Sequence, residues 1–208
     1  ESHTCLLLGT RYVLLRQEFL KWREWRRDLP RAARKVLVTM GGSDPDNASL
    51  KVIQALAQVE TDSLEVVVVL GVCNPHYEEL RSVTRDLQFP IRMESRVRNM
   101  AELMAWADVA VAGAGCTFWE IVSMRLPSLL LVLAPNQMSI AKHADLAGIA
   151  TNLGWHSNLS STELALEIIK LLAAKEKREE MVRLSQNLVD GRGTERVLMH
   201  LNSSGLEL

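Results

Sequence analysis

The chain has 208 residues, of which 48% are hydrophobic and 24% charged, and its formal net charge is -1. That length suits one domain with a full hydrophobic core. The near-neutral charge argues against a nucleic-acid binder, which would show a basic excess or stripe. The cysteines and histidines lack metal-ligand or disulfide spacing, which favours a reducing cytoplasm and no metal site. No apolar run is long enough to span a bilayer.

Strands and helices are expected to alternate along most of the chain. Strands are predicted at apolar runs bounded by turn residues, over 35–40, 64–70, 91–93, 108–112, 128–133 and 149–153. Helices are predicted over 47–59, 75–87, 99–106, 117–124 and 139–147, and helical segments over 160–201. Because the strand runs are continuously apolar, we expect both faces of the sheet to be covered. The expected fold class is therefore α/β, a Rossmann-like parallel sheet with helices on both faces.

Composition divides the chain into three parts. Residues 1–34 are rich in arginine and tryptophan and have one strand-like run at 11–15, so we interpret them as the remnant of a connector to a second domain. Residues 35–160 form the expected Rossmann-like ligand-binding domain, and residues 161–208 the helices that pack on it. We expect an apolar patch near the connector, covered by another domain or by self-association as a homodimer.

The residues after the first strand are suited to a phosphate. Ligands of open parallel sheets bind beyond the carboxyl ends of the strands. There, Gly41 and Gly42 let backbone amides approach an anion, and Ser43 follows them. The next helix would add free N–H groups and a partial positive charge. A simple turn with an Asp or Asn helix cap explains the same residues, and the segment matches neither a Walker loop nor GxGxxG.

Two later strands end in residues suited to a sugar. Gly115, Thr117 and Glu120 follow the strand over 108–112, and the Glu120 carboxylate could accept hydrogen bonds from both ribose hydroxyls. The alternative is a glutamate favoured by the helix dipole. Asn136 and Gln137 follow the strand over 128–133, where amide side chains suit sugar hydroxyls or an N-acetyl group. A loop with a helix cap is the alternative here.

Taken together, segments between about residues 8 and 155 resemble the C-terminal domain of the UDP-sugar hydrolases of pseudaminic acid biosynthesis (PseG-like) and of SpsG-type spore-coat polysaccharide proteins. The segments that carry the resemblance are LGTRYVLLRQEF (8–19), MGGSDPDN (40–47), NM (99–100), GCTFWE (115–120) and LPSLLLVLAPNQ (126–137). This family has the GT-B architecture, shared with MurG-type transferases, in which two Rossmann-like domains face each other and the C-terminal one binds UDP.

The resemblance implies a UDP-sugar site in the domain over 35–160. It implies diphosphate contacts from Gly41, Gly42, Ser43 and Thr117, a further UDP contact from Gly115 and a ribose contact from Glu120. It also implies uracil contacts from the backbone around Val97, Asn99 and Met100, and sugar contacts from Asn136 and Gln137. Two positions depart from the family pattern. Cys116 stands where serine is frequent, and Pro135 stands where an acidic residue is common, which bears on sugar specificity.

The family reaction is hydrolysis of UDP-2,4-diacetamido-2,4,6-trideoxy-β-L-altropyranose, with water activated by a histidine of the N-terminal domain. We therefore assign no catalytic residue or cofactor to this chain, and expect it to need an N-terminal domain or partner subunit. Two alternatives stay open. One is the donor-binding domain or subunit of a MurG-like UDP-GlcNAc glycosyltransferase. The other is a non-enzymatic α/β module, because fold alone does not determine function.

Overall fold

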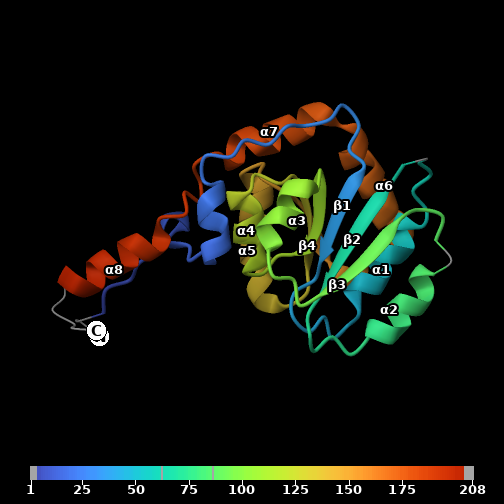
Figure 1. Cartoon of the computed structure of the whole chain (residues 1–208), viewed down its shortest axis with the longest axis horizontal. Helices are drawn as coiled ribbons and strands as arrows, with labels where there is room; N and C mark the ends of the chain where they lie inside the picture. The colour runs from blue at the N-terminus through green and yellow to red at the C-terminus, as the bar shows by residue number, and fades with distance from the viewer. Residues whose placement is uncertain (1–3, 62, 86, 204–208) are drawn as a thin grey trace.

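The computed structural model describes residues 4–61, 63–85 and 87–203. A six-stranded sheet forms its centre, in the order β3-β2-β1-β4-β5-β6, and every neighbouring pair is parallel (Figure 1). The strands are β1 (Lys35–Thr39), β2 (Glu65–Leu70), β3 (Ile91–Ser95), β4 (Val109–Gly113), β5 (Ser128–Val132) and β6 (Thr151–Trp155). This arrangement confirms the predicted Rossmann-like fold class.

Helices cover both faces of the sheet (Figure 1). One face carries α1 (Ala48–Leu56), α2 (Tyr77–Thr84) and α6 (Ser161–Ala173). The other carries α3 (Met100–Trp106), α4 (Thr117–Ser123) and α5 (Met138–Leu146). The chain ends in α7 (Lys175–Ser185) and α8 (Gly193–Ser203). Short 3-10 helices are η1 (Thr10–Tyr12), η2 (Gln17–Trp22), η3 (Pro135–Gln137) and η4 (His156–Asn158).

The apolar strands build a separate core on each face. Along β2, Val66 and Val68 pack into the core beneath α1 and α6, whereas Val67 packs into the core beneath α3 and α4. Successive side chains of a strand point to opposite faces, so a strand that is buried on both sides must be apolar throughout. The valine run at 66–69 is therefore apolar because both faces of β2 are buried, as its sequence predicted.

Several element boundaries differ from the predicted ones. The strand β3 extends to Ser95 because its pairing with β2 continues to Leu70↔Ser95, although Arg92 is exposed. The strand β6 begins at Thr151 rather than at 149, because Gly148 ends α5 with a φ of 68° and the turn after it is buried. A capping box begins α6, with the Ser160 side chain accepting from the Glu163 amide.

The first 34 residues contain η1 and η2 rather than a strand over 11–15. We call residues 4–34 the connector. It runs along the domain and is held by buried arginines: Arg27 donates to the carbonyls of Met104 and Met124 near the ends of α3 and α4, and Arg178 of α7 donates to the Pro30 carbonyl. At one end, η1 contacts α8, and both project from the body as an arm (Figure 1). Within the described ranges, no helix is long and apolar enough to cross a membrane.

Candidate functional site

In the sheet, β1 and β4 are neighbours although two strands lie between them in the sequence. Both strands are parallel and paired in register, with Thr39 opposite Ala112, so they end at the same level of the sheet. The chain leaves β1 for the face of α1 and leaves β4 for the face of α4. Such a divergence between neighbouring strands is the topological switch point at which open α/β sheets bind ligands. The predicted site residues lie in the loops on its two sides.

Three loops converge at this edge. A Cβ placed on Gly113, at the end of β4, would lie 3.6 Å from the Met40 carbonyl oxygen after β1 and 2.8 Å from Leu133 Cδ1 after β5. Gly41, Gly42 and Ser43 are exposed, and no described residue accepts a hydrogen bond from their amides. The loop after β1 therefore presents open N–H groups near the end of β4.

The N-terminus of α1, by contrast, is already capped. The buried carboxylate of Asp44 accepts from the amides of Ala48 at 2.8 Å and Ser49 at 2.9 Å. A carboxylate at this place satisfies the unpaired amides of the first turn and interacts favourably with the helix dipole. The sequence suggested that these amides would be available to an anion, whereas the structure leaves that role to the amides of Gly41 to Ser43.

A glycine after β2 supports the loop after β1. A Cβ on Gly71 would lie 1.6 Å from the Gly42 carbonyl oxygen, 2.4 Å from its carbonyl carbon and 2.7 Å from its Cα. The backbones of the two loops are thus in direct contact, which only a residue without a side chain permits. A Cβ on Gly42 would meet nothing within 4 Å, so that residue borders open space.

Glu120 lies in the first turn of α4 and is held by the connector. Arg16 donates from Nε to Oε1 at 2.8 Å and from Nη2 to Oε2 at 2.9 Å. The Glu120 side chain is 14% exposed and that of Arg16 is 47% exposed. The bond to Glu120 raises the pKa of the Arg16 guanidinium. The residue expected to bind ribose, Glu120, therefore has a largely buried carboxylate, and the more exposed guanidinium of Arg16 balances its charge.

The segment expected near uracil also contacts the connector. The amide of Met100, at the start of α3, donates to Glu18 Oε1 at 2.7 Å. The Asn99 side chain caps the same helix by accepting from the Glu102 amide at 3.3 Å, while Val97 is half-buried against the core. The amides of Met100 and Glu102 at the start of α3 are therefore already paired. Of the segment expected to contact uracil, the backbone before Asn99 is the part that could bind the base.

The loops after β4 and β5 are joined by Gln137. Its Oε1 accepts from the Leu133 amide at 3.0 Å, and its Nε2 would lie 3.5 Å from a Cβ on Gly115. Asn136 beside it is exposed, and within the described residues its side chain has no hydrogen-bond partner. Thr117 is half-buried at the start of α4. Of the two residues expected to contact the sugar, Asn136 is exposed to solvent, whereas Gln137 connects the loops after β4 and β5.

Sequence reasoning did not identify Arg16, Glu18 or Gly71 as parts of this region. Gly71 carries a usable signal, because it follows a buried strand just as Gly41 does. Arg16 and Glu18 carry none, because their partners Glu120 and Met100 lie 104 and 82 residues away. Among the described residues there is no group of acidic, His or Cys side chains that could hold a metal ion.

The arrangement suits binding of an anion joined to a diol. Open amides lie on one side of the switch point and a carboxylate with hydrogen-bonding capacity on the other. A cavity of about 240 Å³ lies elsewhere, between the connector and residues 186–192, and neither Gly42 nor Glu120 lines it. The candidate site is therefore an exposed ledge along the carboxyl edge of the sheet.

Two curated proteins are similar to this chain over most of its length. The spore coat polysaccharide biosynthesis protein SpsG of Bacillus subtilis (strain 168) is 29% identical over 199 residues, which are 95% of this chain and 58% of that protein. The UDP-N-acetylglucosamine–N-acetylmuramyl-(pentapeptide) pyrophosphoryl-undecaprenol N-acetylglucosamine transferase of Methylococcus capsulatus is 28% identical over 165 residues, covering 76% of this chain and 46% of that enzyme. The chain thus spans about half the length of these curated relatives.

Solved structures show the same fold. The crystal structure of MurG from Acinetobacter baumannii superposes with a TM-score of 0.67 at 18% identity, covering 91% of this chain and 54% of that one. The family described as glycosyltransferase family 28 C-terminal domain matches residues 36–192, which include β2 to β6, all of β1 except Lys35, and both sides of the switch point. The chain therefore belongs to the glycosyltransferase family 28 C-terminal domains.

Proposed function

We propose that this domain binds the UDP part of a UDP-sugar across the β1–β4 switch point. The amides of Gly41, Gly42 and Ser43 would receive the diphosphate, and Glu120 would accept hydrogen bonds from the ribose hydroxyls. Gly115 and Thr117 would adjoin the diphosphate, the backbone from Val97 to Asn99 the uracil, and Asn136 the sugar.

The observation that carries this proposal is that the loops after β1 and β4 lie at the same edge of the sheet. Open amides after β1 and a carboxylate in the first turn of α4 flank neighbouring strands that end in register. A UDP-sugar presents the complementary groups, with a dianionic diphosphate joined through C5′ to a ribose diol. Membership of the family and the UDP-N-acetylglucosamine transferase among the relatives support a nucleotide-sugar.

Calorimetry with UDP, UMP and ADP tests the binding. We expect UDP to bind with a Kd in the micromolar to millimolar range and more tightly than ADP. Glu120→Gln should weaken UDP binding by about 1.5–3 kcal/mol, the range for hydrogen bonds to charged groups. Glu167→Gln, which alters a half-exposed carboxylate of α6 on the opposite face, is the matched control and should bind as the unaltered chain does. Unchanged UDP affinity of Glu120→Gln would remove this residue from the site.

We further propose that the complete enzyme passes the sugar of the UDP-sugar to water, as the resemblance to the PseG-like hydrolases implies. The groups that activate water would come from a second domain or subunit facing this ledge. In a preparation that contains this domain together with that partner, UDP release without any acceptor is the expected result, and the isolated chain should release none.

Transfer to an acceptor sugar is the second candidate. The relative that is named an N-acetylglucosamine transferase favours it, because its similarity covers 76% of this chain. The same preparation separates the two candidates. UDP release that requires an added acceptor would support transfer, whereas release at an equal rate without acceptor supports hydrolysis.

A further inference from the structure

We propose that Arg16 is a positioning residue that fixes the Glu120 carboxylate for a ribose diol, so that the connector forms part of the nucleoside site. This inference depends on the proposed UDP binding. It assigns a role in ligand recognition to a segment that would otherwise serve only to link domains.

The first support is the geometry of the ion pair. Two nearly equal hydrogen bonds, 2.8 Å and 2.9 Å long, join two nitrogens of one guanidinium to the two oxygens of Glu120. Such a bidentate pair fixes the plane of the carboxylate as well as its place. Within the described residues, no other group donates a hydrogen bond to these oxygens. The orientation of Glu120 therefore depends on Arg16.

The second support is the remaining acceptor capacity. An ionised carboxylate has two oxygens with about four lone-pair sites, and the Arg16 fork occupies one site on each oxygen. One site on each oxygen is left, and these two sites point away from each other, so one of them can accept a hydrogen bond from a ribose hydroxyl while Arg16 holds the carboxylate. Because the Glu120 side chain is only 14% exposed, a guanidinium at its side also balances a charge that water would balance poorly.

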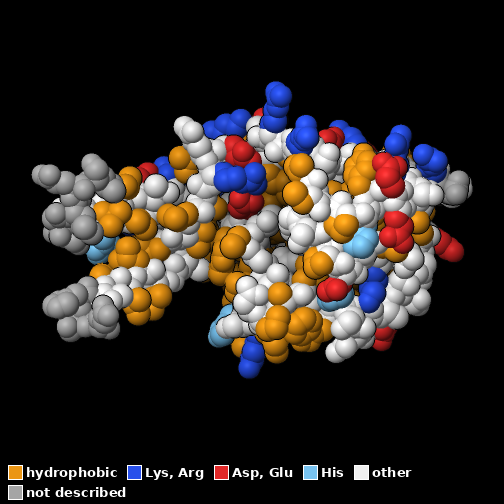
Figure 2. All heavy atoms as spheres, turned by 90° about the horizontal axis from the view of Figure 1, so that it is seen from below, with side chains coloured by type: hydrophobic (Ala, Val, Ile, Leu, Met, Phe, Trp, Pro, Cys, Tyr) orange, Lys and Arg blue, Asp and Glu red, His pale blue; other side chains and the backbone are white. Residues whose placement is uncertain are grey.

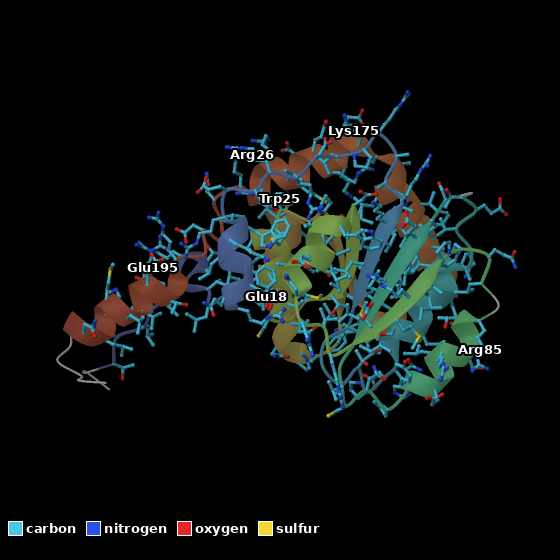
Figure 3. The ribbon with its side chains drawn as sticks, in the orientation of Figure 1. Glu18, Trp25, Arg26, Arg85, Lys175 and Glu195 are labelled. Carbon is cyan, nitrogen blue, oxygen red and sulfur yellow. The ribbon has the colours of Figure 1, made fainter. Side chains whose placement is uncertain are left out.

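The third support is that Arg16 is itself held in place. Its Cζ lies 5.4 Å from the ring centroid of the buried Phe19, and its Nη1 lies 3.4 Å from Glu18 Oε1. Glu18 in turn accepts from the Met100 amide at the start of α3. Figure 3 labels Glu18 on the connector. The connector thus links α3 and α4, the two helices that would flank the nucleoside, through three consecutive interactions.

A double-mutant cycle tests the role. Binding of UDP and of 2′,3′-dideoxy-UDP is measured by calorimetry for the unaltered chain, Arg16→Met, Glu120→Gln and the double variant. We expect Arg16→Met to weaken UDP binding roughly 10-fold and to change dideoxy-UDP binding by less than about 2-fold, so that discrimination between the ligands is lost. The double variant should bind UDP about as weakly as Glu120→Gln alone, because the two residues act as a unit.

Two further variants control for structural effects. Lys21→Met breaks an exposed ion pair of the same segment, Lys21 Nζ to Glu102 at 3.4 Å, and should leave both affinities unchanged. Arg16→Lys should keep part of the discrimination, because an ammonium can hold one carboxylate oxygen but lacks the planar fork. Thermal unfolding checks that each variant is folded.

The outcomes separate this inference from the proposed function. If Glu120→Gln loses discrimination while Arg16→Met keeps it, positioning by Arg16 is wrong and UDP binding stands. Equal weakening of both ligands in Arg16→Met would reveal a merely structural role, and tighter UDP binding would reveal competition with the ribose; either overturns the inference. If the unaltered chain binds no UDP, the proposed function itself fails, and this role fails with it.

Discussion

At the residue scale, Gly42 and Gly71 illustrate two different needs for a missing side chain. Gly71 touches the backbone of Gly42, and an added methyl group would overlap the Gly42 carbonyl at 1.6 Å. Gly42 itself borders open space, and an added methyl group there would meet no protein atom within 4 Å. The first glycine is thus required by packing between two loops. The second is required only if a ligand approaches.

This contrast predicts opposite behaviour of two alanine variants. Gly71→Ala should lower the free energy of unfolding by about 1–3 kcal/mol, as overpacking does, because backbone atoms must move. Gly42→Ala should unfold as the unaltered chain does and still bind UDP more weakly, because its methyl group occupies the space of the diphosphate. Urea unfolding and calorimetry of both variants check this. A Gly42→Ala variant with unchanged UDP affinity would contradict the phosphate assignment.

At the scale of elements, arginines attach the connector to helix ends. The last carbonyls of a helix lack partners within it. The fully buried Arg178 donates from Nη1 to Leu171 near the end of α6 at 2.8 Å, and from Nη2 to Pro30 and Arg31 of the connector at 2.7 Å and 3.0 Å. Arg27 makes the equivalent contacts from the connector to α3 and α4, and its burial lowers the pKa of its guanidinium. The connector is therefore packed as part of the domain.

We expect Arg178→Met to lower the free energy of unfolding by about 1.5–3 kcal/mol, because it leaves buried carbonyls without donors. Arg183→Met on the same helix removes an exposed pair with Glu180 and should change the free energy of unfolding far less. Urea unfolding of the two variants measures both effects. Equal costs would show that the buried contacts of Arg178 do not hold the connector.

At the scale of the whole molecule, the arm formed by residues 4–14 and α8 projects from the body (Figure 1). Hydrophobic side chains gather on it (Figure 2), and the exposed ones are Leu6, Leu8, Leu14, Leu198 and Met199. An apolar surface of this kind agrees with the expectation of a neighbouring domain or a homodimer, and both remain predictions. Arg196 attaches α8 to the body by donating to Asp190, and it joins α8 to the rest of the arm by donating to the Arg11 carbonyl at 2.7 Å.

The pair of Asp190 and Arg196 predicts a pH-dependent attachment of the arm. Hydrogen bonds from Arg196 lower the pKa of Asp190 from 3.8 to about 2. A depressed carboxyl pKa contributes stability above pH 3.8, and this contribution is lost as the pH falls toward 2. Because the Asp190 side chain is 37% exposed, we expect at most about 1 kcal/mol.

Urea unfolding of the unaltered chain and of Asp190→Asn at several pH values measures this contribution. The unaltered chain should be the more stable at pH 6, and the difference should disappear near pH 2. A difference that stays constant over this range would mean that the charge of Asp190 plays no part in holding the arm.

Local patterns were sufficient to predict the sheet, most of its helices and the loops that border the switch point. Each of these depends on signals within a few residues: apolar runs such as 66–69 mark strands buried on both faces, and Gly41 and Gly42 mark a turn. The boundaries of β3 and β6 were less accurate, because pairing with a neighbouring strand decides where a strand ends.

The contacts that complete the candidate site could not be read in this way. The order of the strands brings the loops after β1 and β4 to one edge, and the folding of the connector against α3 and α4 brings Arg16 to Glu120 and Glu18 to Met100. An isolated arginine in a basic segment gives no sign of its partner, since the energy of an ion pair depends on separation and burial in space rather than along the chain. Amino-acid pattern thus suggested most groups of the candidate site, and three-dimensional packing added Arg16 and Glu18 and determined which groups are free and which are paired.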